Sequence, residues 1–464
     1  MKFQRIFFFP LCFHAKFFFH KKNKFYSIKL KKKETQSKKP IVRMKFVVHF
    51  FFLSLFFHFL KSKLIMILEA YRHGAREPLS DYYNADEYLH WGELTSVGMR
   101  QHYNLGKFLR SIYIDKRHFL TKDYDPNEIY IRSTDYNRTI QSAQSQLYGL
   151  YPLGTGPQIP MNLNPMYENP PFLRKFRQKK HHKNGLPKGF QPVPIHTFPK
   201  YNDSMLLPGD YNCSIIQVFE EKVKNSSYLE NLTERFKNVS LEVGRLINLT
   251  TEETESLTIY DVCKIYDVFI CDVYDDKPLP QNISDNLWKN LTLLSHIYKI
   301  YKISADLQML QFYVTPFFQE IILSFESKIN GSSGDLKWKM YSAHDTSLAV
   351  FMTALNLTSY QCIDAQISNG SNESINCFPS PEFAANLIIE LHHGKKSGQY
   401  VKVRYNGQYV YLCETKKKKC SWNEFLGRLK NFMVDYDTIC NSENAPYSFV
   451  RSLKTRSHLR ARRP

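Results

Sequence analysis

The segment LIMILEAYRHGAR, residues 64–76, decides the architecture, because a short apolar run leads directly into a cluster of arginine and histidine. An apolar run of this length is typical of a buried strand. The pattern recurs twice, since Ile129–Ile131 leads into Arg132-Ser133-Thr134-Asp135 and Trp338–Ala343 leads into His344-Asp345. We therefore predict three buried strands, each followed by polar side chains.

Helical patterns follow two of these strands. Thr95 begins one amphipathic segment as a capping residue, and residues 139–150 form another. Strands that alternate with helices predict an α/β fold, in which a largely parallel sheet carries flanking helices. Asn406-Gly407 separates two alternating segments, residues 400–405 and 408–412, and predicts a hairpin at one edge of this sheet or packed beside it.

The hydrophobic period changes in the middle of the chain. Between roughly residues 214 and 325, apolar residues recur at helical spacing. We therefore predict an inserted, mostly helical smaller domain at 214–325, and an α/β domain in two parts, 63–213 and 326–450.

The formal charge of +20 is concentrated at the two ends of the chain. Residues 1–43 hold 13 basic residues and one acid, and residues 451–464 hold six basic residues and no acid. Residues 63–450 carry 42 residues of each sign and are formally neutral. We therefore expect no nucleic-acid partner and interpret residues 451–464 as a solvated basic tail.

An apolar run at Phe46–Leu60 follows the internal methionine Met44. It is shorter than the ~20 residues of a membrane span and has the length of a signal-peptide core. We interpret residues 44–62 as a signal peptide and residues 1–43 as a basic Lys/Phe-rich extension outside the mature protein. The alternative is an anchor that holds the chain on a membrane, since a small-x-small cleavage site is missing; without such an anchor we expect no stable membrane partner.

Cysteines and glycosylation sequons indicate an oxidising compartment. Apart from Cys12 the cysteines form an even set of eight, without C-x-x-C spacing, which favours disulfides over zinc. N-x-S/T sequons are dense between Asn202 and Asn372; they include Asn225, Asn231, Asn238, Asn248, Asn282, Asn290, Asn330, Asn356 and Asn369. We therefore expect a disulfide-bonded glycoprotein that is secreted or lysosomal.

Three arginines follow predicted strands: Arg72, Arg76 and Arg132. Because parallel strands place their carboxyl ends at one edge of a sheet, these guanidinium groups are expected to converge, and converging cations require an anion between them. Phosphate matches the planar guanidinium forks. A neutral histidine in such a cluster, here His73, can attack phosphorus, and a carboxylic acid beside it can protonate the leaving group.

The motif Arg72-His73-Gly74-Ala75-Arg76-Glu77-Pro78 resembles the RHGxRxP signature of the histidine acid phosphatases, in the branch that includes the lysosomal and prostatic enzymes. Further segments agree in order and spacing over nearly all of residues 63–440; they are Gly92–Met99, Arg132–Asp135, Gln191–Thr197 and Tyr341–Thr346. The resemblance implies a histidine phosphatase-like fold with a helical insertion, and an acid phosphatase that hydrolyses small-molecule phosphomonoesters through a covalent phosphohistidine.

The resemblance also implies a role for each site residue. His73 is the expected nucleophile and Asp345 the expected proton donor. The expected phosphate ligands are Arg72, Arg76, Arg132 and His344. No metal and no organic cofactor is implied.

Disulfide pairs follow from the same resemblance. Cys413 and Cys420 resemble a local pair of the family, and Cys213 and Cys440 resemble its long-range pair. The usual partner position of Cys271 holds Asn386, so that this bridge is either absent or rerouted to Cys263, with Cys362 and Cys377 as a new local pair.

Two other interpretations and the assembly stay open. A phytase-like or mutase-like relative would share the Arg-His-Gly motif; the His344-Asp345 pair resembles the acid phosphatase subgroup more than the mutases, and the phytase alternative stays open. A catalytically inactive phosphate-binding glycoprotein could use the same fold, but binding alone would not need Asp345. The sequence does not determine the oligomeric state, and a homodimer is one alternative.

Overall fold

The computed structural model describes residues 62–441, with gaps at 81–87, 89, 164, 169, 174–182, 282, 370–375, 396 and 414–416. Three predicted segments lie outside the described residues: the extension 1–43, the hydrophobic segment 44–62 except for Ser62, and the tail 451–464. The predictions for these segments stay predictions. Among the helices described, none combines the length and the apolar character that a membrane span needs.

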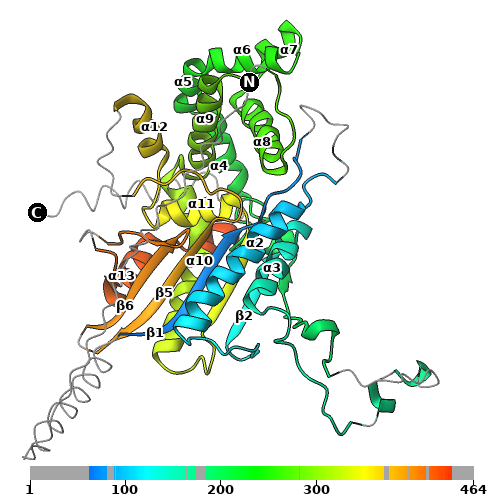
Figure 1. Cartoon of the computed structure of the whole chain (residues 1–464). Coiled ribbons are helices and arrows are strands. Elements are labelled where there is room, and N and C mark those ends of the chain that lie inside the picture. The colour runs from blue at the N-terminus through cyan, green and yellow to red at the C-terminus, as the bar shows by residue number, and fades with distance from the viewer. Residues whose placement is uncertain are drawn as a thin grey trace, which may run out of the picture. The chain divides into compact units, whose positions relative to one another are not determined.

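One mixed sheet organises the described chain, with strand order β3-β2-β4-β1-β5-β6-β7 and β8 paired to β6 (Figure 1). Its strands are β1 (Lys63–Arg72), β2 (Ile129–Thr134), β3 (His196–Phe198), β4 (Trp338–Ala343), β5 (Asn386–Gly394), β6 (Gly398–Tyr405), β7 (Gln408–Tyr409) and β8 (Cys420–Ser421). β1 and β2 both pair in parallel with β4, whereas β5 runs antiparallel to β1. The three predicted strands are confirmed, and so is the hairpin, as β6 and β7 flank Asn406-Gly407 at the sheet edge.

The described helices are α2 (Ser96–Leu109), α3 (Asn137–Leu150), α4 (Ile215–Lys224), α5 (Ser227–Arg235), α6 (Lys237–Leu246), α7 (Thr251–Ser256), α8 (Ile259–Asp275), α9 (Asp285–Ser304), α10 (Leu307–Ile329), α11 (Asp345–Ala354), α12 (Tyr360–Asn369), α13 (Trp422–Phe432) and α14 (Tyr436–Asn441). Thr95 caps α2, because its side chain accepts a hydrogen bond from the Gly98 amide. Helices α4 to α10 follow one another between β3 and β4, where the sequence predicts a helical insertion. The boundaries 214–325 stay a prediction.

Strand β1 supplies apolar side chains to both faces of the sheet. Ile67 and Tyr71 pack with residues of α2 and α3 in one buried cluster, whereas Met66, Leu68 and Ala70 belong to a second cluster on the opposite face. A strand buried on both faces explains why the sequence reads as a continuous apolar run.

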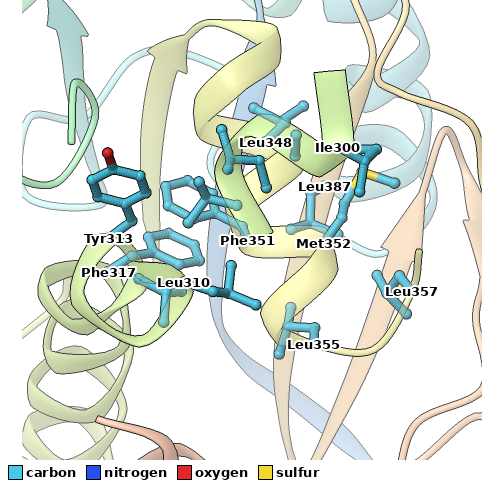
Figure 2. Packing of buried hydrophobic residues seen from close by; sticks show 14 of the residues in the cluster. Ile300, Leu310, Tyr313, Phe317, Leu348, Phe351, Met352, Leu355, Leu357 and Leu387 are labelled. Carbon is cyan, nitrogen blue, oxygen red and sulfur yellow. The ribbon is translucent and has the colours of Figure 1, made fainter. Parts of the chain in front are cut away.

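The second cluster contains the contact between α10 and α11. Figure 2 shows Phe317 and Phe351 beside each other, and their rings stack with centroids 3.6 Å apart. Leu387 of β5 lies in the same cluster. This packing fixes α11, whose first residue is Asp345, at the carboxyl end of β4.

Three disulfides join described residues: Cys213–Cys440, Cys362–Cys377 and Cys413–Cys420. They confirm the predicted pairs. Cys263 and Cys271 are free and buried, so the alternative of a rerouted Cys271–Cys263 bridge is wrong. Both cysteines lie in α8, and eight residues of helix separate them by about 12 Å, which is too far for a disulfide.

Helices α2 and α3 lie side by side (Figure 1) and touch backbone to backbone. A Cβ atom at Gly106 of α2 would lie 2.0 Å from the carbonyl oxygen of Gln146 in α3. Gly427 of α13 provides a contrast, because a Cβ atom there would meet nothing within 4 Å. The close packing of α2 against α3 therefore requires a residue without a side chain at position 106.

We expect Gly106→Ala to destabilise the protein by about 1–3 kcal/mol, because α3 must move away from the new methyl group. The control Gly427→Ala is expected to stabilise by up to about 1 kcal/mol, since alanine has the higher helix propensity. Urea unfolding measures both. Equal effects of the two substitutions would contradict close backbone packing at Gly106.

A buried polar network lies between β1 and the α2–α3 pair. Glu69 of β1 is fully buried and accepts hydrogen bonds from Gln146 and Asn386, at 3.0 and 3.3 Å. His102 of α2 lies 3.0 Å from Gln146 Oε1 through Nδ1 and 3.0 Å from the Arg72 carbonyl oxygen through Nε2. Burial raises the pKa of Glu69 to about 7 against the opposing effect of these hydrogen bonds.

This raised pKa links stability to pH. Between pH 4.5 and about 7 the unfolded chain loses the Glu69 proton while the folded chain keeps it, so stability falls as pH rises. We expect the wild type to lose about 3 kcal/mol more stability between pH 4.5 and pH 8 than Glu69→Gln does. Urea unfolding at both pH values checks this, with the exposed Glu242→Gln as control. A pH dependence that Glu69→Gln leaves unchanged would show that another group carries it.

Candidate active site

The carboxyl ends of β1 and β4 bring two histidines together. Arg72 pairs with Ala343 in the parallel register, and the amide of His73 donates to the Ala343 carbonyl oxygen at 3.0 Å. His344 follows directly after β4, and its ring centroid lies 5.5 Å from that of His73 in an edge-on arrangement. Two predicted site residues from distant parts of the sequence therefore lie side by side.

The surroundings of His73 keep its ring neutral. Nδ1 donates to the Gly74 carbonyl oxygen at 2.8 Å, which leaves the lone pair of Nε2 free. Burial lowers the pKa of His73 well below its usual value, and the charges of Arg72 and Arg138 lower it further. Gly74 allows this close fit, since a Cβ atom there would lie 2.4 Å from the Gly98 carbonyl oxygen. The result is a buried imidazole with an unprotonated nitrogen.

Arg72 and Arg76 are held in place by neighbouring groups. Arg72 donates to the Pro381 carbonyl oxygen at 2.8 Å, and its guanidinium carbon lies 4.1 Å from the centroid of the Phe383 ring. Arg76 donates from Nη2 to both carboxylate oxygens of Asp267 in α8, each at 3.0 Å. Such fixed guanidinium groups are suited to bind an anion without reorganisation.

Arg132, which we expected among the phosphate ligands, requires a correction. Its side chain pairs with the fully buried Asp203, and its guanidinium carbon lies 4.1 Å from the centroid of the Phe198 ring. Arg132 lies inside β2, where it pairs with Tyr341 of β4 and His196 of β3. Its side chain therefore projects from a face of the sheet and not from the strand end.

Arg138, and not Arg132, lies near Arg72, Arg76 and His344. It lies in the first turn of α3, directly after β2, and its guanidinium carbon lies 4.5 Å from the centroid of the Tyr136 ring. Burial lowers the pKa of Arg138 to about 10, and Arg76 and Arg72 lower it as well. Its Nε atom is buried without a hydrogen-bond partner among the described residues. A position in the first turn after a strand is the sequence signal that would have identified it.

His344 and Asp345 complete the cluster. His344 Nε2 lies 3.0 Å from Thr134 Oγ1, and burial with the charge of Arg138 lowers the pKa of His344 to about 3 despite Asp345. Asp345 Oδ2 lies 3.5 Å from Arg72 Nη2 and 3.3 Å from Lys299 Nζ of α9. Burial raises the pKa of Asp345, but the cations Arg72, Lys299 and Lys302 outweigh it, so that the pKa lies well below its usual range.

The cluster therefore joins three guanidinium groups, two neutral imidazoles and one carboxylate. Such an arrangement is suited to a multiply charged anion with several oxygens, and a neutral His73 can act on it as a nucleophile. Lys299 and Asp267 come from helices that the sequence did not connect to the site. Their side chains reach it only through tertiary packing.

Comparison with known proteins gives a consistent result. The sequence model of the histidine phosphatase superfamily (branch 2) matches residues 63–406. Lysosomal acid phosphatase from Xenopus laevis is 29% identical over 308 residues, and the match covers 64% of this chain and 62% of the relative. Prostatic acid phosphatase from Homo sapiens is 28% identical over 306 residues, which cover 64% and 70% of the two chains.

Solved structures share the fold. The phytase of Hafnia alvei in complex with myo-inositol hexakis sulphate superposes with a TM-score of 0.58 at 15% identity, covering 81% of this chain and 98% of the phytase. The phytase from Citrobacter braakii gives a TM-score of 0.53 at 15% identity, covering 80% and 98%. At this identity the likeness establishes the α/β fold and no substrate.

Arg138 and Arg132 can be separated by matched substitutions. We expect Arg138→Gln to weaken the binding of inorganic phosphate by at least about tenfold, because a guanidinium contact to an anion is lost. We expect Arg132→Gln to leave phosphate affinity within about twofold but to destabilise the fold by about 3 kcal/mol, because Asp203 loses its buried partner. Calorimetric titration and urea unfolding measure the two effects. If Arg132→Gln and Arg138→Gln lose phosphate affinity equally, Arg132 binds phosphate and the correction above is wrong.

Proposed function

Because the chain belongs to the histidine phosphatase superfamily (branch 2), we propose that it is an acid phosphatase that hydrolyses phosphate monoesters through a covalent phosphohistidine on His73. The observation that carries the proposal is a buried, neutral His73 with a free Nε2, set among the guanidinium groups of Arg72, Arg76 and Arg138. Acid phosphatases are also among the related proteins.

In the first step the phosphate group of the ester binds between Arg72, Arg76, Arg138 and His344. Nε2 of His73 attacks phosphorus, so that a P–N bond forms while the P–O bond to the leaving group breaks. The three guanidinium groups stabilise the charge that spreads over the equatorial oxygens. Asp345 gives its proton to the departing oxygen, which leaves as an alcohol.

In the second step water attacks the phosphohistidine. Asp345, now a carboxylate, takes a proton from the water while the P–N bond breaks, which regenerates neutral His73 and releases inorganic phosphate. The same carboxyl group therefore acts as an acid and then as a base.

The pKa of Asp345 explains a preference for acid pH. In the free site Arg72, Lys299 and Lys302 hold the carboxyl ionised despite its burial. A phosphate dianion bound among the same cations offsets their charge and raises the pKa of Asp345. Because the starting value is low, the protonated form is still favoured by acid conditions.

Compartment and partners follow from the same proposal. Three disulfides are consistent with an oxidising compartment, and the related lysosomal acid phosphatases support a lysosomal or secreted location. The proposed partner is a small-molecule phosphomonoester, without nucleic acid or a bound cofactor. A homodimer is the proposed assembly to be tested by light scattering.

The central test uses protein that begins at Met44. We expect turnover of p-nitrophenyl phosphate at acid pH and its loss by at least about a thousandfold in His73→Ala, because the substitution removes the attacking Nε2. The exposed His393→Ala should keep wild-type activity. Quenching in alkali, in which phosphohistidine survives, should trap labelled phosphate on the wild type only. Equal turnover by the wild type and His73→Ala would refute the nucleophile.

A substrate panel separates the remaining interpretations. Inositol hexakisphosphate and simple alkyl and aryl monoesters are compared at the same acid pH. Faster cleavage of the inositol ester would favour a phytase. Phosphate binding without turnover or labelling would identify a binding protein.

A further inference from the structure

Asp345 carries two cations on one oxygen atom. Lys299 Nζ and Arg72 Nη2 lie 3.3 and 3.5 Å from Oδ2, while Oδ1 accepts a hydrogen bond from the Thr346 amide at 3.0 Å. A carboxyl group that donates a proton must carry that proton on one oxygen. A proton added to Oδ2 would face both of these positive charges, so one of the two cation contacts must be given up before Oδ2 can carry the acidic proton.

The two cations differ in their freedom to leave. Arg72 is almost fully buried, donates to the Pro381 carbonyl oxygen and lies over the Phe383 ring, which fixes its plane. Lys299 has a side chain that is 21% exposed, on a flexible four-carbon stem with a compact ammonium group. Lys299 is therefore the contact that can be exchanged.

The titratable groups that face Asp345 come from several elements, and most of those that carry a charge are cations. β1 and the turn after it contribute Arg72, His73 and Arg76, α3 contributes Arg138, α9 contributes Lys299 and Lys302, and His344 precedes Asp345 in the chain. The acids nearby are already engaged: Asp267 pairs with Arg76, and Asp210 faces Lys200, Lys302 and Arg138. An incoming phosphate dianion is therefore a strong competitor for the Lys299 ammonium group.

We propose that Lys299 is a positioning residue that pairs with the Asp345 carboxylate before substrate binds. When phosphate binds, the Lys299 side chain moves so that its ammonium group leaves Asp345 and pairs with an oxygen of the phosphate. The exchange frees Oδ2 of Asp345, which takes up a proton from solvent and gives it to the leaving-group oxygen. This inference rests on the proposed phosphatase function and adds one element to it: α9 couples occupation of the site to protonation of the acid.

The exchange has two measurable consequences. Bound phosphate pairs with the Lys299 ammonium group, which pairs with Asp345 when no phosphate is bound, so loss of Lys299 weakens phosphate binding. Asp345 loses a cation when phosphate binds, so its pKa rises more than the charge of phosphate alone would cause. A purely structural role for Lys299 would produce neither effect.

The experiment compares the wild type with Lys299→Gln, Lys299→Arg and, as a control on the same helix, the exposed Lys289→Gln. Calorimetry measures the affinity for inorganic phosphate. Carbon NMR of labelled aspartate, assigned with Asp345→Asn, measures the pKa of Asp345 with and without phosphate. The pH profile of kcat/KM is recorded for an alkyl phosphate, whose leaving group requires a proton.

In Lys299→Gln we expect phosphate affinity to fall about tenfold, because a charge-assisted contact is lost. The pKa of Asp345 in the free protein should rise by about one unit, so the alkaline limb of the kcat/KM profile moves to higher pH. Added phosphate should then raise this pKa less than it does in the wild type. Lys299→Arg should restore phosphate affinity, and Lys289→Gln should match the wild type.

Unchanged phosphate affinity in Lys299→Gln, or an equal response of the Asp345 pKa to phosphate in the two proteins, would overturn the exchange. The binding and NMR measurements do not depend on turnover. If no phosphomonoester is hydrolysed while both responses depend on Lys299, the phosphatase function fails and the exchange stands.

Discussion

The structure depends on holding several like charges at one edge of a sheet. Arg72, Arg76 and Arg138 converge around a neutral His73, and each repels the others in surroundings that water does not fully screen. Only a rigid frame can maintain such a cluster. The parallel pairing of β1 with β4, buried on both faces, supplies it, because it fixes the backbone directly before His73 and His344.

The helices between β3 and β4 contribute charges of both signs to the site. Asp267 of α8 binds Arg76 through both oxygens, and Lys299 of α9 binds the carboxylate that follows β4. The sheet edge and the first turn of α3 therefore supply the arginines proposed to bind phosphate, and α8 and α9 supply side chains that pair with the charged groups at this edge.

The sequence could predict those parts of the site that adjoin the predicted strands. Four site residues lie at or directly after strand ends: Arg72, His73, His344 and Asp345. An apolar run followed by the motif was therefore sufficient to predict that these residues lie close together. Arg132 was misplaced because a short apolar run does not show where its strand ends, and the strand continues to Thr134. Lys299 could not be predicted, since a lysine on an amphipathic helix has the same pattern whether it faces solvent or a carboxylate 46 residues later in the chain.

The proposed catalysis makes opposite demands on the two titrating groups, since His73 would have to be unprotonated and Asp345 protonated. Burial and the surrounding cations both satisfy the first demand, because both disfavour a positive imidazole. At Asp345 the two act in opposite directions, since burial raises the pKa of the carboxyl group and the cations lower it more strongly. Acid conditions reconcile them only if the pKa of His73 lies below the working pH, and burial together with the nearby cations lowers that pKa. The fold agrees with the same conditions, since the buried Glu69 is most easily accommodated as a neutral acid. Stability and the proposed chemistry therefore favour the same side of neutrality for different reasons. Burial disfavours the charge of Glu69, whereas the cations around Asp345 hold its pKa low, so that its acid form needs acid conditions.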